Sequence, residues 1–417
     1  MNPNIPKEKI LEAVKKHKTP FHIYDEAQIR ENARRFKKAF SILPGFKEFF
    51  AVKALPNPFI LKILKEEGFG TDCSSLPELV LSEKVGIIGE NIMFSSNDTP
   101  AEEYVKANEL GGIINLDDIS HIEFLEKNAE IPDLICFRYN PGPLKKGNVI
   151  IGHPEEAKYG FTREQLFEGY KICKEKGAKR FGIHTMMVSN ELKVKNLIES
   201  ARIMFELVLE IKEKTGIELE FVNLGGGIGT PQMPDEPATM PYEEIAKGIK
   251  KEYEKILDGK LSTKVYLECG RTITGPFGWL VMKVRHIKHI YKDFVGTDAS
   301  MANLMRPALY GAYHHIEVLG KENKPKDHKY DVTGSLCENN DKLAVDRMLP
   351  EIEVGDILII HNTGAHGHAM GFNYNGKLRS AEILLREDGS LVEIRRAETT
   401  DDLFSTLDFK KLKSFKP

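Results

Sequence analysis

The chain has 417 residues, 41% hydrophobic and 29% charged, with a formal net charge of −3. This balance is typical of a globular protein, and the near-neutral charge argues against nucleic acid or an anionic membrane surface as a partner. The length exceeds that of one ordinary core and predicts two domains.

The N-terminal region begins without the apolar core of a signal peptide, so we expect no export. Nowhere in the chain is there a run of about 18 apolar residues, so no membrane-spanning helix is expected. The first predicted strand is FHIYD at residues 21–25. It precedes the main repeating pattern, and we expect it to pair with a sheet formed by the C-terminal part of the chain.

From about residue 47, short β-rich runs alternate with amphipathic helical segments such as residues 57–68 and 194–216. Eight strands are predicted, at residues 47–54, 69–75, 91–97, 112–118, 134–140, 180–187, 219–226 and 264–270. Eight parallel strands with outer helices predict a (β/α)8 barrel. The pattern alone leaves a doubly wound open sheet as the alternative.

After Pro276 helical segments become rare, and strands separated by turns follow at residues 279–292, 329–337, 356–364 and 380–396. This change predicts a C-terminal antiparallel β domain. We therefore expect a barrel domain over residues 26–280 and a β domain over residues 281–417 that also includes the N-terminal residues 1–25.

One lysine, Lys53, lies within the apolar stretch FFAVKALPNP. A lysine in a buried strand is costly unless it is paired or used chemically. Two interpretations stay open: an amine that reaches solvent, or a nucleophilic amine that forms a Schiff base. In a (β/α)8 barrel the active site lies at the C-terminal ends of the strands, where Lys53 is expected.

Two further stretches end predicted strands. LGGGIG (residues 224–229) is by itself typical of a tight turn, but the loops after strands 7 and 8 of such barrels often bind phosphate. It is not a dinucleotide fingerprint, because Thr230 occupies the last glycine position. In YLECGRT, Glu268 and Arg271 have two interpretations. They form a structural ion pair, or Glu268 is a carboxylate that faces a ring nitrogen and Arg271 belongs to a loop that helps to hold a phosphate. An amine, a phosphate loop and a buried carboxylate together are what pyridoxal phosphate requires.

Over nearly its whole length the chain resembles the fold-type III pyridoxal phosphate-dependent decarboxylases, and among them the diaminopimelate decarboxylases. The motifs that carry the resemblance are TPFHIYD, FFAVKALPNP, RYNPG, AKYGF, LGGGIG, ECGR, MRPALYGAYH, TGSLCENND, DRMLP and GDILIIHNTGAHG. The resemblance implies a barrel of the alanine-racemase type and a relation to the ornithine and D-ornithine/D-lysine decarboxylases. It also implies pyridoxal 5′-phosphate bound to Lys53.

The resemblance assigns roles around the cofactor. Glu268 would face the pyridine nitrogen, and Arg271 would lie near both phosphate and substrate. The remaining cofactor-binding residues implied in this way are His184, Ser189, Gly227, Gly270 and His366.

The resemblance also implies how substrate is held. Arg306 and Tyr310 match residues that bind a distal carboxylate, for which an arginine fork is suited. The catalytic Cys337 and the substrate-binding Glu338 would come from the second subunit of a homodimer with shared active sites. Without that motif, a lone cysteine in a β region is usually a small buried hydrophobe.

Three departures from the family pattern bear on the substrate. Met186 stands where the family has a second histidine in HxHxGS, His366 replaces the tyrosine of GAY, and CENND replaces CESGD. His361, His366 and His368 lie close together in sequence, but no recognised ligand spacing completes a metal site, and none is expected.

The expected reaction is decarboxylation of meso-2,6-diaminopimelate to L-lysine. Decarboxylation of D-lysine or D-ornithine to a diamine stays open, as does, less favoured, a non-catalytic regulatory homologue that binds pyridoxal phosphate. A racemase is disfavoured, because alanine racemases place arginine, not a carboxylate such as Glu268, at the ring nitrogen.

Five scattered cysteines (Cys73, Cys136, Cys173, Cys269, Cys337) without CxxC pairs are typical of the reducing cytoplasm.

Overall fold

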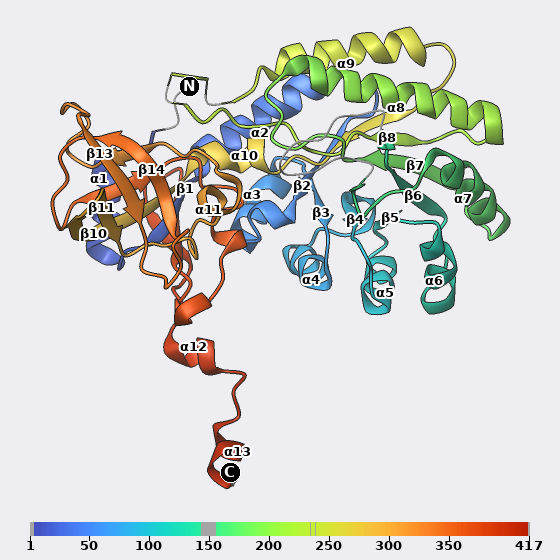
Figure 1. The fold of residues 1–417 in the computed structure, drawn as a ribbon. Coiled ribbons are helices and arrows are strands. Elements are labelled where there is room, and N and C mark those ends of the chain that lie inside the picture. Colours follow the sequence, from blue (N-terminus) through green and yellow to red (C-terminus); the bar gives the residue numbers. More distant parts are fainter. Residues whose placement is uncertain (1–3, 143–155, 234, 238, 416–417) are drawn as a thin grey trace. The chain divides into compact units, whose positions relative to one another are not determined.

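A computed structural model describes residues 4–142, 156–233, 235–237 and 239–415 of the chain. The chain divides into two compact units, one over Glu26–Pro276 and the other comprising Asn4–Asp25 with Phe277–Pro417. The first unit is a barrel ringed by helices, and the second is built mainly of strands (Figure 1).

The first unit is a closed barrel of eight parallel strands in chain order. Its strands are β2 (Lys47–Ala51), β3 (Gly70–Cys73), β4 (Ile92–Ser95), β5 (Ile113–Leu116), β6 (Leu134–Tyr139), β7 (Arg180–Thr185), β8 (Phe221–Asn223) and β9 (Lys264–Leu267). The last strand pairs with the first, with Lys47 opposite Tyr266. This closure confirms the predicted (β/α)8 barrel over the open sheet.

One helix precedes the first barrel strand, the others follow strands, and together they cover the outside of the barrel (Figure 1). They are α2 (Glu26–Phe40), α3 (Pro58–Glu66), α4 (Leu76–Val85), α5 (Ala101–Glu109), α6 (Ser120–Asn128), α7 (Arg163–Glu175), α8 (Val194–Thr215), α9 (Tyr242–Ile256) and the short α10 (Arg271–Thr274). In α9, Ile245, Ile249 and Ile256 are buried, the spacing of one helical face. At the start of α3, the Asn57 side chain accepts a hydrogen bond from the Phe59 N–H and Pro58 occupies the first turn.

The barrel interior has an apolar part and a polar part. Its apolar core consists of Phe49, Met93, Ile113, Leu134, Cys136, Phe221 and Tyr266. Buried polar side chains come from the last two positions of strands or directly after them: Asp72, Asn115, Arg138, His184, Asn223 and Glu268. Parallel strands end on the same side of the barrel, so these polar groups gather at its C-terminal mouth.

The second unit contains a nine-stranded sheet in the order β14-β13-β11-β10-β1-β16-β17, with β15 pairing to β10 and β12. The strands are β1 (Phe21–Asp25), β10 (Gly278–His289), β11 (Asp293–Thr297), β12 (Ile316–Val318), β13 (His328–Thr333), β14 (Lys342–Leu349), β15 (Ile357–Ile360), β16 (Ala381–Leu385) and β17 (Leu391–Arg395). As predicted, residues 21–25 join this sheet, between β10 and β16. The predicted antiparallel domain is confirmed with two parallel pairs within it, β1–β16 and β11–β13.

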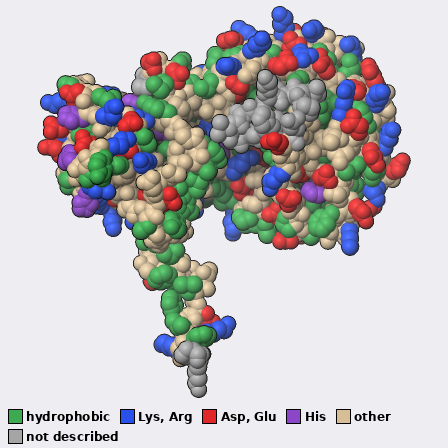
Figure 2. Space-filling view, viewed as in Figure 1, with side chains coloured by type: hydrophobic (Ala, Val, Ile, Leu, Met, Phe, Trp, Pro, Cys, Tyr) green, Lys and Arg blue, Asp and Glu red, His purple; other side chains and the backbone are tan. Residues whose placement is uncertain are grey.

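Short helices complete the second unit. They are α1 (Lys7–Lys16), α11 (Arg306–Tyr310), α12 (Thr400–Phe404) and α13 (Phe409–Ser414). Figure 2 shows positive and negative side chains interspersed over the visible surface. Among the described residues, every helix is too short or too polar to cross a bilayer.

Candidate active site

Lys53 lies in a 3-10 turn, Val52–Ala54, just beyond the end of β2. We expected it inside a buried strand, but the strand ends at Ala51, and the lysine side chain is 52% exposed. Its Nζ lies 3.4 Å from Oδ2 of Asp72, which is itself buried in β3. The negative charge of Asp72 raises the pKa of Lys53 above its ordinary value, while burial raises the pKa of Asp72 to about 7. A group that can accept the lysine proton therefore lies beside the amine.

Glu268 directly follows β9 and is buried. Its Oε2 lies 2.8 Å from Nε2 of His184, and its Oε1 accepts a 2.6 Å hydrogen bond from Nδ2 of Asn223. Burial opposes ionisation, but the interaction with His184 and its hydrogen bond, the Lys53 charge and the Asn223 hydrogen bond lower the pKa of Glu268. The carboxylate is therefore held as an anion at the barrel mouth.

His184 is the neutral partner of this pair. Burial lowers the pKa of the imidazole and outweighs the raising effect of Glu268. A neutral ring that donates from Nε2 leaves Nδ1 as an acceptor, and this buried atom has no hydrogen-bond partner among the described residues. The charge of the pair therefore resides on the carboxylate.

Two polar residues of this cluster, Asn223 and Asp72, were missed by the sequence analysis. Asn223 is the last residue of β8 and lies opposite His184 in register, and His184 lies opposite Arg138. For Asn223 the available signal was a polar residue directly after the apolar pair Phe221 and Val222, near the end of a predicted strand. Such a residue faces the mouth of the barrel, where buried polar groups need partners.

The glycine loop after β8 packs closely against the segment after β7. Gly227 has φ +87°, and a Cβ there would lie 2.2 Å from the carbonyl oxygen of Val188. The Glu191 N–H donates a 2.8 Å hydrogen bond to the Gly227 carbonyl. Ser189 lies within this segment, so the structure brings together the two stretches expected to bind phosphate.

Gly270 and Arg271 follow Glu268 on the same side of the barrel. A Cβ at Gly270 would lie 2.6 Å from the Cβ of Ala54, so this glycine packs against the turn that contains Lys53. The carbonyl of Arg271 accepts a 3.4 Å hydrogen bond from the Thr230 hydroxyl, just past the glycine loop. The amine, carboxylate and glycine loop are thus neighbours at one mouth.

Met186 follows β7, between His184 and Ser189. A Cβ on Gly225 would lie 3.3 Å from its sulfur, so the thioether lies beside the glycine loop. A thioether packs well against flat rings but contributes no charge and no strong hydrogen bond there.

In the second unit, Arg306 begins α11 and is 4% exposed. Its guanidinium carbon lies 5.9 Å from the ring centroid of Tyr310, which ends the same helix. Within the part of the chain that the structure describes, no carboxylate pairs with Arg306, and its Nε has no hydrogen-bond partner. Burial lowers the pKa of this guanidinium. A buried cation without a counter-ion is costly, and a bound anion would lower that cost.

Cys337 and Glu338 lie in the turn between β13 and β14. Cys337 is a free, exposed thiol whose backbone N–H donates a 2.6 Å hydrogen bond to Oδ1 of Asn375, so it is not the buried hydrophobe that a lone cysteine usually is. Glu338 accepts a 3.1 Å hydrogen bond from the Asn340 N–H. Both side chains face solvent within their own unit.

His366 has φ +55°, in the left-handed region that non-glycine residues seldom adopt. The segment around it packs closely on the start of β10, since a Cβ on Gly278 would lie 2.4 Å from the Cα of Gly364. Among the described residues no group of three or more His, Cys, Asp or Glu side chains is arranged to hold a metal ion.

The mouth of the barrel fits a pyridoxal group. The amine of Lys53 would meet the aldehyde, the anionic carboxylate of Glu268 would pair with a protonated ring nitrogen, and the glycine loop at Gly227 lies beside the segment that contains Ser189.

Residues 26–275 match the family model for the pyridoxal-binding domain of pyridoxal-dependent decarboxylases. The chain belongs to this family. It is a pyridoxal phosphate-dependent carboxy-lyase, as the motifs led us to expect.

Relatives in this family match the chain along nearly all of its length. Protein TabA of Pseudomonas amygdali pv. tabaci is 42% identical over 399 residues, covering 96% of this chain and 93% of TabA. A diaminopimelate decarboxylase of Methanothermobacter thermautotrophicus is 35% identical, covering 94% and 92%. The crystal structure of M. jannaschii diaminopimelate decarboxylase in complex with L-lysine has a TM-score of 0.87 at 31% identity, covering 98% and 94%.

Proposed function

We propose that this decarboxylase converts meso-2,6-diaminopimelate to L-lysine and carbon dioxide. The observation that carries the proposal is Arg306, a buried guanidinium without a carboxylate partner among the described residues. Diaminopimelate has a second carboxylate, remote from the reacting carbon, that would pair with it bidentately. Relatives named diaminopimelate decarboxylase at 32–35% identity support the same substrate.

The barrel residues would bind and orient the cofactor. Lys53 would bind it through Nζ, and Asp72 would take up the proton that this amine must lose. Glu268 would face the ring nitrogen, kept anionic by His184 and Asn223. The bound cofactor supplies an electron sink for the electron pair left by the departing carbon dioxide.

Phosphate binding would fall to the neighbouring loop segments. The glycine loop at Gly227 packs against the segment that contains Ser189, so backbone N–H groups and a hydroxyl would reach one anion. Gly270 and Arg271 would help to hold the same phosphate, and Arg271 would also contact substrate. His366 would contact the cofactor in place of the family's tyrosine.

The β-domain residues would handle substrate. Arg306 and Tyr310 would hold the distal carboxylate, and Glu338 would bind an ammonium group. Cys337 Sγ would return a proton to the carbon that has lost its carboxylate, so that one proton replaces one carbon dioxide. By resemblance to the family, Cys337 and Glu338 would serve the site of the second copy in a homodimer. All five cysteines are free thiols, which supports a location in the reducing cytoplasm.

Release of carbon dioxide from meso-diaminopimelate, D-lysine and D-ornithine tests the substrate. We expect the highest kcat/KM with meso-diaminopimelate, and for Arg306→Gln a loss of about tenfold to a hundredfold on that substrate alone, since a hydrogen-bonded charge contributes about 1.5–3 kcal/mol. The distal carboxylate is absent from D-lysine, so its turnover should not depend on Arg306. Faster turnover of D-lysine or D-ornithine by the unmodified enzyme would contradict the proposal.

The rival substrates keep one observation in their favour. Met186 lies beside the glycine loop, where its thioether leaves an uncharged surface. The Met186 and His366 departures therefore leave room for a simpler basic D-amino acid, and the three-substrate comparison decides between them.

A further inference from the structure

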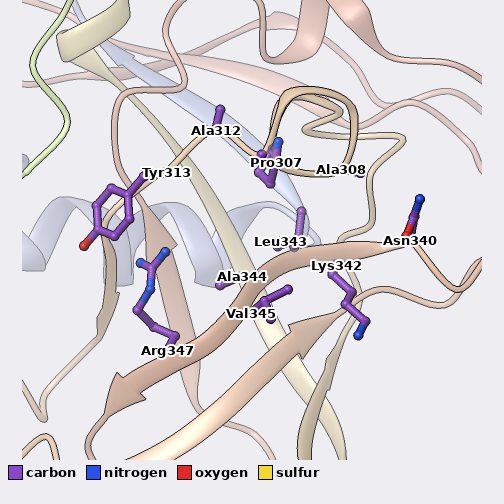
Figure 3. A pocket seen from close by; sticks show the side chains of 11 residues that line it. Pro307, Ala308, Ala312, Tyr313, Asn340, Lys342, Leu343, Ala344, Val345 and Arg347 are labelled. Carbon is purple, nitrogen blue, oxygen red and sulfur yellow. The ribbon is translucent and has the colours of Figure 1, made fainter. Parts of the chain in front are cut away.

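The β domain contains a cavity of about 310 Å³ that the proposed reaction does not use. It lies between β14 and the chain from Pro307 to Tyr313, which includes most of α11 (Figure 3). Arg306 is not among the lining residues, although Pro307 directly follows it. The volume is at the lower end of the range for small-molecule sites.

Arg347, from β14, forms one end of this cavity beside Tyr313 (Figure 3). Its guanidinium carbon lies 4.0 Å from the centroid of the Tyr313 ring, and Nη1 donates a 2.7 Å hydrogen bond to the His314 carbonyl. The stacking and the single bond to a carbonyl fix the plane of the guanidinium. Neither of them neutralises its charge.

No acidic side chain is found among the 11 lining residues. In the part of the chain that the structure describes, no carboxylate forms an ion pair with Arg347. The other basic residue of the lining, Lys342, pairs with Asp331 at 3.0 Å. Arg347 is therefore the one lining cation whose charge is not matched by an acid among the described residues.

The middle of the cavity is apolar. Leu343, Ala344 and Val345 follow one another along β14 between the Arg347 end and the Asn340 end, with Pro307 and Ala308 across from them (Figure 3). A ligand with an anionic head at Arg347 would lay a short aliphatic chain along this surface. A fully hydrated inorganic anion would gain nothing from that part of the cavity.

We propose that this cavity binds a small aliphatic carboxylate, with the carboxylate paired to Arg347 and the hydrocarbon chain against β14. The fixed plane of the guanidinium suits bidentate pairing with a planar carboxylate. The site is separate from Arg306 and does not depend on the proposed substrate. Because α11 borders the cavity directly after Arg306, an occupant would lie next to the proposed substrate-binding helix.

Calorimetric titration of the full-length holoenzyme with sodium butyrate tests the proposal, with sodium chloride at equal ionic strength as the reference. We expect millimolar binding that Arg347→Gln weakens by about tenfold or more, the effect of losing one charged pair. Arg285→Gln is the matched control, because this exposed arginine pairs with Asp298 in the same unit and lies outside the cavity. It should bind butyrate as the unmodified enzyme does.

Ala308→Leu keeps Arg347 but fills the cavity, and it should abolish binding even if Arg347→Gln impairs folding. Arg306→Gln should leave the part of the isotherm that depends on Arg347 unchanged. Three results would overturn the proposal: no butyrate binding to the unmodified enzyme, binding unaffected by both cavity variants, or binding lost in Arg306→Gln and kept in Arg347→Gln. The last result would assign the carboxylate to the substrate site.

Discussion

Nε2 of His184 lies 2.8 Å from Oε2 of Glu268, and both side chains are almost completely buried. Asn223 donates to the other carboxylate oxygen, so the neutral ring and the amide hold one negative charge in a fixed place. Such a charge is costly in a protein interior unless it is fully hydrogen-bonded or meets a cation. We propose that a protonated pyridine nitrogen of the bound cofactor is that cation.

Replacing the histidine tests this relationship. His184→Ala removes a donor from Glu268, whose pKa should then rise because burial acts with less opposition. We expect kcat to fall about tenfold to a hundredfold, the effect of one hydrogen bond to a charged group, and the acidic limb of the pH profile to move to higher pH. The exposed His289→Ala is the control. An unchanged acidic limb would show that His184 does not act through Glu268.

The glycine loop offers a matched pair of variants. Gly227 and Gly216 both have positive φ, so Ala should cost about 1 kcal/mol of backbone strain at either site. A Cβ at Gly227 would also lie 2.2 Å from the Val188 carbonyl, whereas one at Gly216 would meet nothing within 4 Å. Cofactor titration should therefore show weaker binding, by about tenfold, for Gly227→Ala alone. Equal affinity in the two variants would argue against phosphate binding at this loop.

The ionisation of Glu382 should make the stability of the folded β domain depend on pH. It is 1% exposed and accepts a 2.7 Å hydrogen bond from the Tyr24 hydroxyl. Burial opposes ionisation, but the charges of His368 and Arg395 lower its pKa to about 2. Burial also lowers the pKa of His368, so this imidazole is neutral near neutral pH. Arg395 is then the cation that remains beside Glu382.

A carboxyl with a lowered pKa stabilises the folded state above its ordinary pKa of 4.5, and this stabilisation is lost as the pH falls toward 2. Urea unfolding should show this loss between those values. Glu382→Gln should be less stable at neutral pH by about 2 kcal/mol and should lack this part of the acid dependence. The same acid dependence in the variant would assign it to other carboxyl groups.

The architecture could be predicted from the sequence because the alternation of strands and helices is a local pattern along the chain. Most barrel strands are short runs rich in apolar residues that precede an amphipathic helix, and all eight were located, with ends shifted by a few residues. Strands β11, β12 and β14 were not predicted. β12 has only three residues, and the register of β13 with β14 shifts twice, which breaks the alternation that marks a strand.

The site was predictable as motifs but not as contacts. Lys53 and Glu268 stood out because each is a charged residue within an apolar run. Their partners Asp72 and Asn223 come from other strands. Pairing of side chains so far apart in sequence depends on barrel register, and parallel strands that are buried on both faces have near-continuous apolar runs that do not mark this register. The exposed setting of Lys53 likewise depends on where β2 ends, and strand ends are the least predictable feature of such patterns.

The central claim is that Lys53 binds the cofactor, and borohydride reduction of the holoenzyme followed by peptide mapping tests it most directly. We predict a single pyridoxyl-modified lysine at Lys53, and neither this adduct nor the long-wavelength absorbance of lysine-bound cofactor in Lys53→Ala. A pyridoxyl adduct on another lysine, with Lys53 unmodified, would contradict the account.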